Sequence, residues 1–155
     1  MHRKNKKALA ISLAIPLGLG LIVGFLARPS AAYELLEKPF FTPPAYIFPI
    51  AWTILYLLMG ISSYFIYKSN HPKRYSALMT YAVQLMVNLL WTPIFFTLNL
   101  RLVAFFWILL LIYLVVKMIL EFYRISSKAA YLQLPYLLWL ILAALLNFSI
   151  VILNL

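Results

Sequence analysis

The sequence predicts an all-α integral membrane protein, a five-transmembrane-helix bundle. Of its 155 residues, 66% are hydrophobic and only 10% are charged, whereas a soluble domain of this size carries about 25% charged residues. The apolar residues form long uncharged blocks and do not alternate with polar residues as the strands of a membrane β-barrel do. Because a backbone in lipid must satisfy its own hydrogen bonds, each block is expected to form one helix. We expect residues 1–155 to form a single membrane domain.

Five blocks are long enough to cross a bilayer. At 1.5 Å per residue, each extends roughly 30 Å, which is the thickness of the hydrocarbon core. The first block follows a basic tail, the second follows the prolines of the longest connection, and only the fourth contains a charge, Lys117. The stem of Lys117 can carry its ammonium group to the interface. The expected spans are residues 9–27, 45–67, 75–98, 102–120 and 132–153.

The first block has an alternative interpretation as part of a signal peptide. Residues 1–32 combine a basic start, an apolar stretch and the small residues Ser30-Ala31-Ala32, which resemble a cleavage site. The apolar stretch, however, is longer than the roughly 7–15 residues usual in signal peptides, and it contains Pro16. We therefore expect this block to be retained as the first span. The connection that follows, residues 28–44, is the longest between spans.

The basic residues indicate the orientation of the chain. The formal net charge of +10 alone would also suit a nucleic-acid-binding protein. The basic residues stand at the ends of the apolar blocks, however, which is where membrane topology places them. Nine of them lie in the N-terminal tail and in the connections after residues 67 and 120, and Lys117 makes ten, against three on the other side. We expect a multi-pass protein of a bacterial cell membrane, with a cytoplasmic N-terminus and no nucleic-acid partner.

Side chains suited to catalysis or metal binding are scarce. The chain has no cysteine, its histidines, His2 and His71, lie outside the spans, and no acidic residue lies inside a span. Ion-coupled transport usually requires ionisable groups at membrane depth, and a bound tetrapyrrole iron would lack a His or Cys ligand. The sequence therefore argues against ion-coupled transport, and it predicts no cofactor and no metal site.

Three spans carry neutral polar and aromatic side chains at helical spacing. Residues spaced by three or four positions share one face of a helix. Amides that face lipid are costly, so these faces are expected to turn inward. They comprise Trp52, Tyr56, Gly60 and Ser63 in the second span, Tyr81, Gln84, Asn88, Trp91 and Phe95 in the third, and Trp139, Ala143 and Asn147 in the fifth.

Two interpretations of these faces remain open. The amides of Gln84, Asn88 and Asn147 can simply bond helix to helix, and tryptophans near span ends can anchor the chain at the interface. Alternatively, the faces enclose a cavity of aromatic rings and a few amides, a composition typical of a site for a flat apolar ligand. Gly20 and Gly24 in the first span suit close helix contact, either within the chain or between two copies.

Three stretches resemble the motifs of the translocator protein family, which includes the bacterial tryptophan-rich sensory proteins and the peripheral-type benzodiazepine receptor. They occur in the family's order. The length, the five spans and the long first connection also agree, so the resemblance covers nearly the whole chain. The stretches are Pro39-Phe40-Phe41-Thr42-Pro43-Pro44 with Pro49 to Gly60, then Gln84 to Phe96, and finally Leu134 to Asn147.

The resemblance implies a ligand class and a set of site residues. Members of the family are five-helix bundles, often homodimers, with a pocket capped by the first loop that takes protoporphyrin IX, related tetrapyrroles and benzodiazepine-type compounds. Some bacterial members promote light-dependent breakdown of protoporphyrin, and Trp52 and Trp139 match the tryptophans implicated in that catalysis. By motif position the ligand-binding residues are Trp52, Asn88, Trp91, Trp139, Ala143 and Asn147, and the shared faces add Tyr56, Gln84 and Phe95.

The chain also departs from the family's pattern. The family usually has Trp where Phe41 stands, so a stacking or redox partner at the loop edge is missing. The C-terminal segment lacks the Tyr and the basic residue of the proposed cholesterol motif, which is itself a weak pattern. In the first connection, Arg28 or Lys38 can either pair with the propionates of a porphyrin or remain solvated loop charges.

Three functions follow from these observations. The preferred one is a membrane protein that binds protoporphyrin IX, senses or handles it, and in an enzymatic version promotes its photo-oxidative degradation. A second is a transporter that moves porphyrin or other apolar solutes across the lipid bilayer. A third is a scaffold whose partners do the work. The first is preferred because the inward faces carry Trp, Tyr and Asn and no ionisable group.

Overall fold

Five long membrane-spanning segments dominate the computed structural model, which describes every residue except Met1 and Ser30. Each is long and apolar enough to cross a membrane, which confirms the predicted all-α fold with five spans. The helices are α1 (His2–Leu26), α3 (Ile47–Lys68), α4 (Arg74–Thr92) with the π-helical extension η1 (Pro93–Thr97), α5 (Arg101–Ile125), and α6 (Ser127–Leu132) followed by α7 (Leu134–Leu153). A one-turn helix, α2 (Ala31–Glu34), lies in the long connection.

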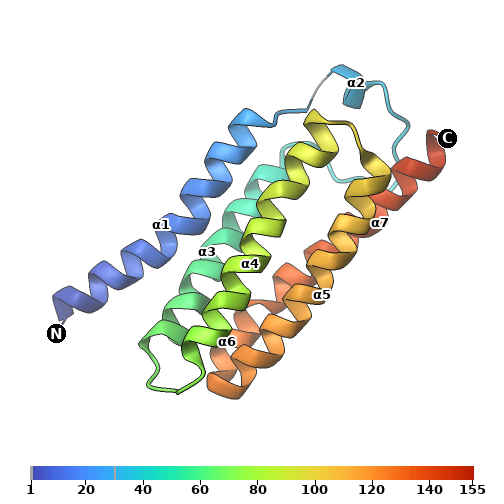
Figure 1. Ribbon diagram of the computed structural model, residues 1–155. Helices are drawn as coiled ribbons and strands as arrows, with labels where there is room; N and C mark the ends of the chain where they lie inside the picture. Colours follow the sequence, from blue (N-terminus) through green and yellow to red (C-terminus); the bar gives the residue numbers. More distant parts are fainter. Residues whose placement is uncertain (1, 30) are drawn as a thin grey trace.

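The helices form one bundle, with α1 at its edge (Figure 1). Within it α3 packs against α1, α4 and α6, and α5 packs against α4, α6 and α7. The α1 helix also contacts α4. Neighbours run antiparallel except for α4 and α1, which run in the same direction. The α3–α4 connection lies at the end of the bundle that holds the N-terminus, whereas α2 and the C-terminus lie at the opposite end.

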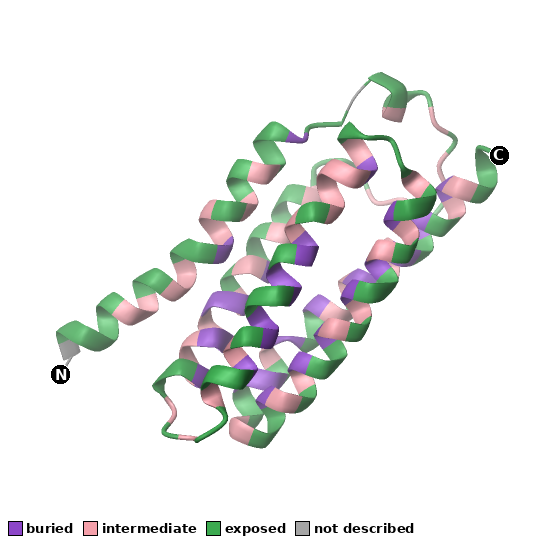
Figure 2. Cartoon of the chain, viewed as in Figure 1, coloured by how far each residue is buried: buried purple, intermediate pink, exposed green. Residues whose placement is uncertain are grey.

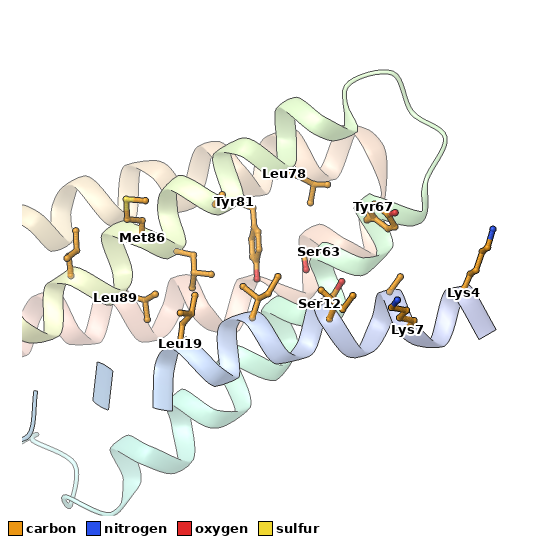
Figure 3. Close-up of a pocket in the computed structure, with 16 residues that line it drawn as sticks. Lys4, Lys7, Ser12, Leu19, Ser63, Tyr67, Leu78, Tyr81, Met86 and Leu89 are labelled. Atoms are coloured by element: carbon orange, nitrogen blue, oxygen red, sulfur yellow. The ribbon is translucent and has the colours of Figure 1, made fainter. Parts of the chain in front are cut away.

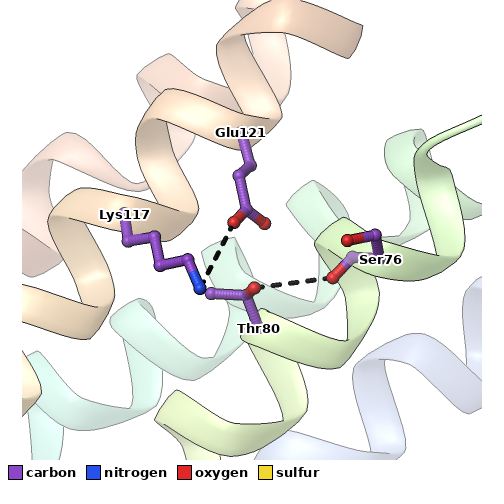
Figure 4. A network of polar contacts seen from close by, with 4 residues as sticks. All are labelled: Ser76, Thr80, Lys117 and Glu121. Carbon is purple, nitrogen blue, oxygen red and sulfur yellow. Dashed lines mark hydrogen bonds and ion pairs between the residues drawn. The ribbon is translucent and has the colours of Figure 1, made fainter.

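The fourth span is longer than predicted. We expected it to end at residue 120, but α5 continues to Ile125. Glu121, one turn beyond Lys117, pairs with it, and Nζ and Oε1 are 3.8 Å apart. Figure 4 shows this pair beside Thr80 of α4. A helix can extend past its apolar block where its charged residues compensate one another, and hydropathy does not detect this extension.

The fifth span is not one continuous α-helix. Its helical segment begins at Ser127, before the expected start at residue 132, and α6 ends before Gln133. The α7 helix then restarts with Pro135 in its first turn. A proline is tolerated there because the first backbone N–H groups of a helix have no partner within that helix.

A π-helical turn ends the third span. Proline has no backbone N–H to donate, and the wider turn is closed by the N–H of Leu98, which donates to the carbonyl of Pro93 (2.9 Å). Phe95 lies within this turn and is buried. Such turns occur frequently at functional sites, and this one borders the site described below.

The first span is the least embedded of the five. Only 6% of its apolar window is buried, against 28–39% in the other spans. It approaches α3 closely at Gly60, where an added Cβ would lie 2.7 Å from the carbonyl oxygen of Ser12. On α1 itself, Gly20 faces the ring of Tyr56, whereas Gly24 has no neighbour within 4 Å. Of the two glycines predicted to allow close contact, Gly20 therefore does so within the chain.

The core runs along the inside of the bundle (Figure 2). Large side chains that are fully buried there include Met59 of α3, Met118 of α5 and Tyr136 of α7. Large apolar side chains also cover the outside, among them Phe106 and Leu138, which are 61% and 68% exposed. An apolar exterior of this kind suits helices surrounded by lipid, because lipid tails are as apolar as the side chains they meet.

Candidate ligand site

A chain of hydrogen bonds joins three helices in the middle of the bundle. The Tyr56 hydroxyl of α3 donates to Oδ1 of Asn88 in α4 (2.8 Å), and Nδ2 of Asn88 donates to the Tyr136 hydroxyl of α7 (2.8 Å). The Tyr136 hydroxyl donates in turn to Oε1 of Gln84 (2.8 Å). Nε2 of Gln84 is buried and has no partner among the described residues. The chain of bonds therefore ends on an unused donor inside the bundle.

A second set of bonds joins α4, α7 and the start of α5. Nε1 of Trp91 donates to Oδ1 of Asn147 (3.2 Å), and Nδ2 of Asn147 donates to the carbonyl of Arg101 (2.9 Å). The ring of Trp91 stacks on that of Phe95, with centroids 5.0 Å and planes 22° apart. The inward face predicted for the third span thus continues through the π turn.

Aromatic rings connect α3 and α7. The ring of Trp52 stacks on Tyr56, with centroids 5.5 Å apart, and meets both Tyr136 and Trp139 edge-on at 6.4 Å. Phe48, one helical turn before Trp52, lies 5.7 Å from Trp139. Centroid distances of about 4.5–7 Å with offset or edge-on geometry are favourable for aromatic pairs. The two tryptophans predicted to be catalytic therefore contact one another between the two helices.

A small cavity of about 40 Å³ lies beside this cluster. Phe48 forms part of its wall and connects it to Trp139. The cavity has room for a few water molecules, whereas sites for drug-sized ligands usually measure roughly 300–1,000 Å³. The structure therefore has the candidate site in a closed state. Its walls are formed by Tyr33, Thr42, Phe48, Trp91, Phe95, Phe96, Ala143, Leu146, Asn147 and Ile150.

The first loop covers this cavity and is tied to the end of α7. The backbone N–H of Glu37 donates to Oδ1 of Asn154 (3.0 Å), and Nδ2 of Asn154 donates to the Glu37 carbonyl (2.9 Å). Tyr33 of α2 places its ring edge-on to Phe96, with centroids 5.0 Å apart. Burial, with a smaller effect from Glu34, raises the pKa of the Tyr33 hydroxyl, although Arg101 acts in the opposite direction. This phenol therefore remains neutral at physiological pH.

The two basic residues of the loop contact groups of the loop itself and of α1. Nζ of Lys38 donates to the Tyr33 carbonyl (3.2 Å) and lies 4.5 Å from the centroid of the Tyr33 ring. The Arg28 guanidinium lies 4.2 Å from the ring of Phe25. Arg101, which the sequence reasoning did not select, lies nearer the cavity, with its guanidinium carbon 5.8 Å from the Phe95 centroid.

The site residues predicted from the sequence fall into two adjoining groups. The first group lines the cavity under the loop, and the second forms the bonded and stacked cluster between α3, α4 and α7. The first comprises Trp91, Phe95, Ala143 and Asn147, and the second comprises Trp52, Tyr56, Gln84, Asn88 and Trp139.

Sequence reasoning left out several residues of this region. Tyr136 is the centre of the bond chain, and its position three residues before Trp139 on the same helical face would have identified it. Phe96 directly follows the selected Phe95 within the π turn, and it also lines the cavity. Tyr33 lies in a loop without periodicity, so no sequence pattern indicates that it covers the cavity.

Together, the fold and the site define a multi-pass helical membrane protein whose interior is lined with aromatic rings and amides. Residues 12–153 match the TspO/MBR family, and the chain belongs to that family. The tryptophan-rich protein TspO of Archaeoglobus fulgidus is 38% identical over 152 residues, which cover 97% of this chain and 99% of that protein.

Two further relatives extend the comparison. The tryptophan-rich sensory protein of Cereibacter sphaeroides is 33% identical over 147 residues, with 95% and 92% of the two chains covered. The translocator protein of Ovis aries is 36% identical over 119 residues, with 75% and 70% covered. These matches confirm the family resemblance inferred from the three motifs.

Proposed function

We propose that this protein binds protoporphyrin IX and similar flat apolar tetrapyrroles between α3, α4 and α7. The observation that carries the proposal is the pair of Trp52 and Trp139, whose rings stand 84° apart at 6.4 Å next to buried amides. Membership of the TspO/MBR family supports it, and one relative is named a tryptophan-rich sensory protein. We also propose that the N-terminus faces the cytoplasm, because the basic residues gather at that end.

The chemistry of the residues suits a flat ring. Faces of Trp52 and Trp139 supply stacking surface for an apolar macrocycle. The amides of Asn88 and Asn147 and the unpaired Nε2 of Gln84 supply hydrogen bonds that fix its orientation. In this proposal the ligand-binding residues are the nine predicted from the sequence, and Arg101 is the nearest cation for a carboxylate at the loop side.

Binding requires the closed site to open. The cavity of about 40 Å³ cannot hold a macrocycle, so the first loop and the rings beneath it must move apart. The hydrogen bonds that hold the loop to the helices include the reciprocal pair between the backbone of Glu37 and the side chain of Asn154. Because few contacts hold a loop of this kind, its opening costs far less than unfolding the bundle.

Titration with protoporphyrin tests the proposal. The porphyrin's own fluorescence anisotropy is the readout, because it does not depend on how many tryptophans a variant retains. Trp52→Phe and Trp139→Phe should each weaken binding by about two- to tenfold, since an aromatic contact contributes about 0.5–1.5 kcal/mol. Trp107→Phe is the matched control, because Trp107 bonds to the Val87 carbonyl on another face of the bundle. Equal effects of all three substitutions would contradict the assignment.

Two further experiments distinguish simple binding from photo-oxidative degradation and from transport. Asn154→Leu removes the bonds to Glu37, so it should accelerate porphyrin association if the loop controls access. Illumination of the loaded protein in air, against a lipid-only control, tests photo-oxidative degradation, which should decline in Trp52→Phe and Trp139→Phe. Uptake of unchanged porphyrin into proteoliposomes, without binding at the tryptophan pair, would instead support the transporter.

A further inference from the structure

A second, larger hollow of the described structure is a groove that the proposed porphyrin site does not use. It measures about 910 Å³ and lies between α1, α3 and α4 (Figure 3). Apolar side chains such as Ile15 and Leu19 of α1 and Leu85 and Leu89 of α4 form its walls. Trp52 and the other residues of the tryptophan cluster do not line it. A ligand of this groove would therefore be separate from the one proposed for the tryptophan cluster.

The groove exists because α1 packs more extensively against α3 than against α4. Gly60 draws α1 close to α3, whereas Ser12 and Ala82 supply only small side chains where α1 faces α4. Several side chains that line the groove remain exposed, such as Ile11 at 50% and Met86 at 64%. The groove is thus open to the surroundings of the bundle, which in a membrane are lipid chains.

Its dimensions match one leaflet of a bilayer. The apolar wall that α1 contributes runs from Ala8 to Leu19, a rise of about 16 Å at 1.5 Å per residue. Half of a hydrocarbon core of ~30 Å is about 15 Å. An acyl chain that enters beside Ala8 would therefore reach the level of Leu19 near the bilayer midplane.

Two cations stand at the mouth of the groove. Lys4 and Lys7 line the end nearest the N-terminus and are exposed. Within the described part of the chain, neither makes a hydrogen bond or an ion pair. The acidic residues lie elsewhere, with Glu34 and Glu37 in the first loop and Glu121 paired with Lys117. A negatively charged group from outside the chain is therefore the natural counter-ion for these lysines.

The ring of Tyr81 forms part of the groove wall on the side of α4. Tyr81 is only 8% exposed, and its hydroxyl is buried beside Ser63. In Figure 3 the ring of Tyr81 points from α4 toward α1 and Ser12. A lipid in the groove would therefore contact the face of this ring and not its buried hydroxyl.

We propose that this groove binds one anionic phospholipid of the leaflet nearest the N-terminus. The phosphate lies between Lys4 and Lys7, and one acyl chain follows α1 as far as Leu19. The lipid fills the space beside the contact between α1 and α4.

Native mass spectrometry with two lipids tests the proposal. The purified protein is titrated with palmitoyl-oleoyl phosphatidylglycerol or with phosphatidylcholine that carries the same chains. We expect one tightly held lipid and a preference for the anionic one on the order of tenfold, since each lysine near a phosphate strengthens binding several-fold. Lys4→Gln with Lys7→Gln should abolish the preference. Arg3→Gln with Lys6→Gln removes the same charge from residues that do not line the groove, and it should retain the preference.

A second pair of variants tests the groove itself. Ala82→Trp fills the groove, whereas Val83→Trp adds the same ring to the neighbouring exposed position outside it. Only Ala82→Trp should release the lipid, and neither lysine variant should alter protoporphyrin affinity. An equal loss of the lipid preference in the Lys4/Lys7 and the Arg3/Lys6 double variants would mean that the surface charge acts without a defined site, and it would overturn the proposal. Loss of a dimer, and not of a lipid, in Ala82→Trp would show that the groove holds a second copy of the chain.

Discussion

Asn88 uses both ends of its amide inside the bundle. Its Oδ1 accepts from Tyr56 and its Nδ2 donates to Tyr136, so one side chain on α4 bonds to both α3 and α7. Bonds of this kind between membrane helices contribute on average about 0.6 kcal/mol each. A ligand that bonds to Asn88 must therefore replace existing hydrogen bonds. Such an exchange adds little to the affinity, but it favours ligands whose polar groups match the positions of the lost partners.

The coupling within this bond chain can be measured. Asn88→Leu should lower the free energy of unfolding by about 1–2 kcal/mol, because two bonds are lost and the Tyr56 hydroxyl is left without its acceptor. Tyr56→Phe should cost less, since Nδ2 of Asn88 retains Tyr136. The double variant should cost less than the sum, because no orphaned hydroxyl then remains. Denaturant unfolding followed by tryptophan fluorescence gives all three values, and strict additivity would contradict the coupling.

Single residues also determine how much of the site was predictable. The amides and tryptophans of the spans were found because an inward face repeats every three or four residues, and lipid makes outward amides costly. Nothing in that repeat indicates that Phe48 and Phe95 close the space to about 40 Å³. Closure depends on Tyr33 and the irregular loop, where the contacts are set by tertiary packing alone.

Among the elements, the five spans follow directly from the length of their apolar blocks, because the bilayer fixes how long a helix must be. The ends of the helices are predicted less accurately than their number. The α5 helix continues beyond the expected residue 120, and the fifth span breaks at Gln133, where the structure separates α6 from α7. Both differences lie at the end of the bundle nearest the N-terminus, where polar residues and water replace the constraint that lipid imposes.

The contact between α1 and α3 depends on a glycine, and a matched pair of variants tests this. In Gly60→Ala the new Cβ would meet the backbone of Ser12 at 2.7 Å, so α1 must shift, at a cost of about 1–3 kcal/mol. In Gly24→Ala the Cβ meets nothing within 4 Å, and the gain in helix propensity should stabilise the protein by about 0.5–1 kcal/mol. Thermal unfolding in detergent measures both, and a loss of stability in Gly24→Ala would reveal a contact with another chain.

At the scale of the whole molecule, the structure separates two regions of different chemistry. The aromatic and amide cluster lies between α3, α4 and α7 under the first loop, whereas the open apolar groove lies between α1 and α4. The lysines at the mouth of the groove and the loop over the cluster stand at opposite ends of the bundle. The proposed lipid and the proposed tetrapyrrole would therefore not compete for the same space.

The charge asymmetry between the two ends predicts the orientation of the whole bundle. Nine or ten of the basic residues belong to the end that holds the N-terminus, so this end should face the cytoplasm. Because the chain has no cysteine, single cysteines can be introduced without background. Glu34→Cys lies in the first loop and Asn70→Cys in the α3–α4 connection, at opposite ends of the bundle, and both positions are exposed.

A membrane-impermeant maleimide added to intact bacterial spheroplasts should label Glu34→Cys, and it should label Asn70→Cys only after permeabilisation. The reverse pattern would place the N-terminus outside and move the proposed lipid groove to the other leaflet. Partial labelling of both variants would mean that the chain inserts in two orientations. Exchange of Lys4, Lys6 and Lys7 for glutamine should shift labelling toward Asn70→Cys, because the tail then loses much of the charge that retains it in the cytoplasm.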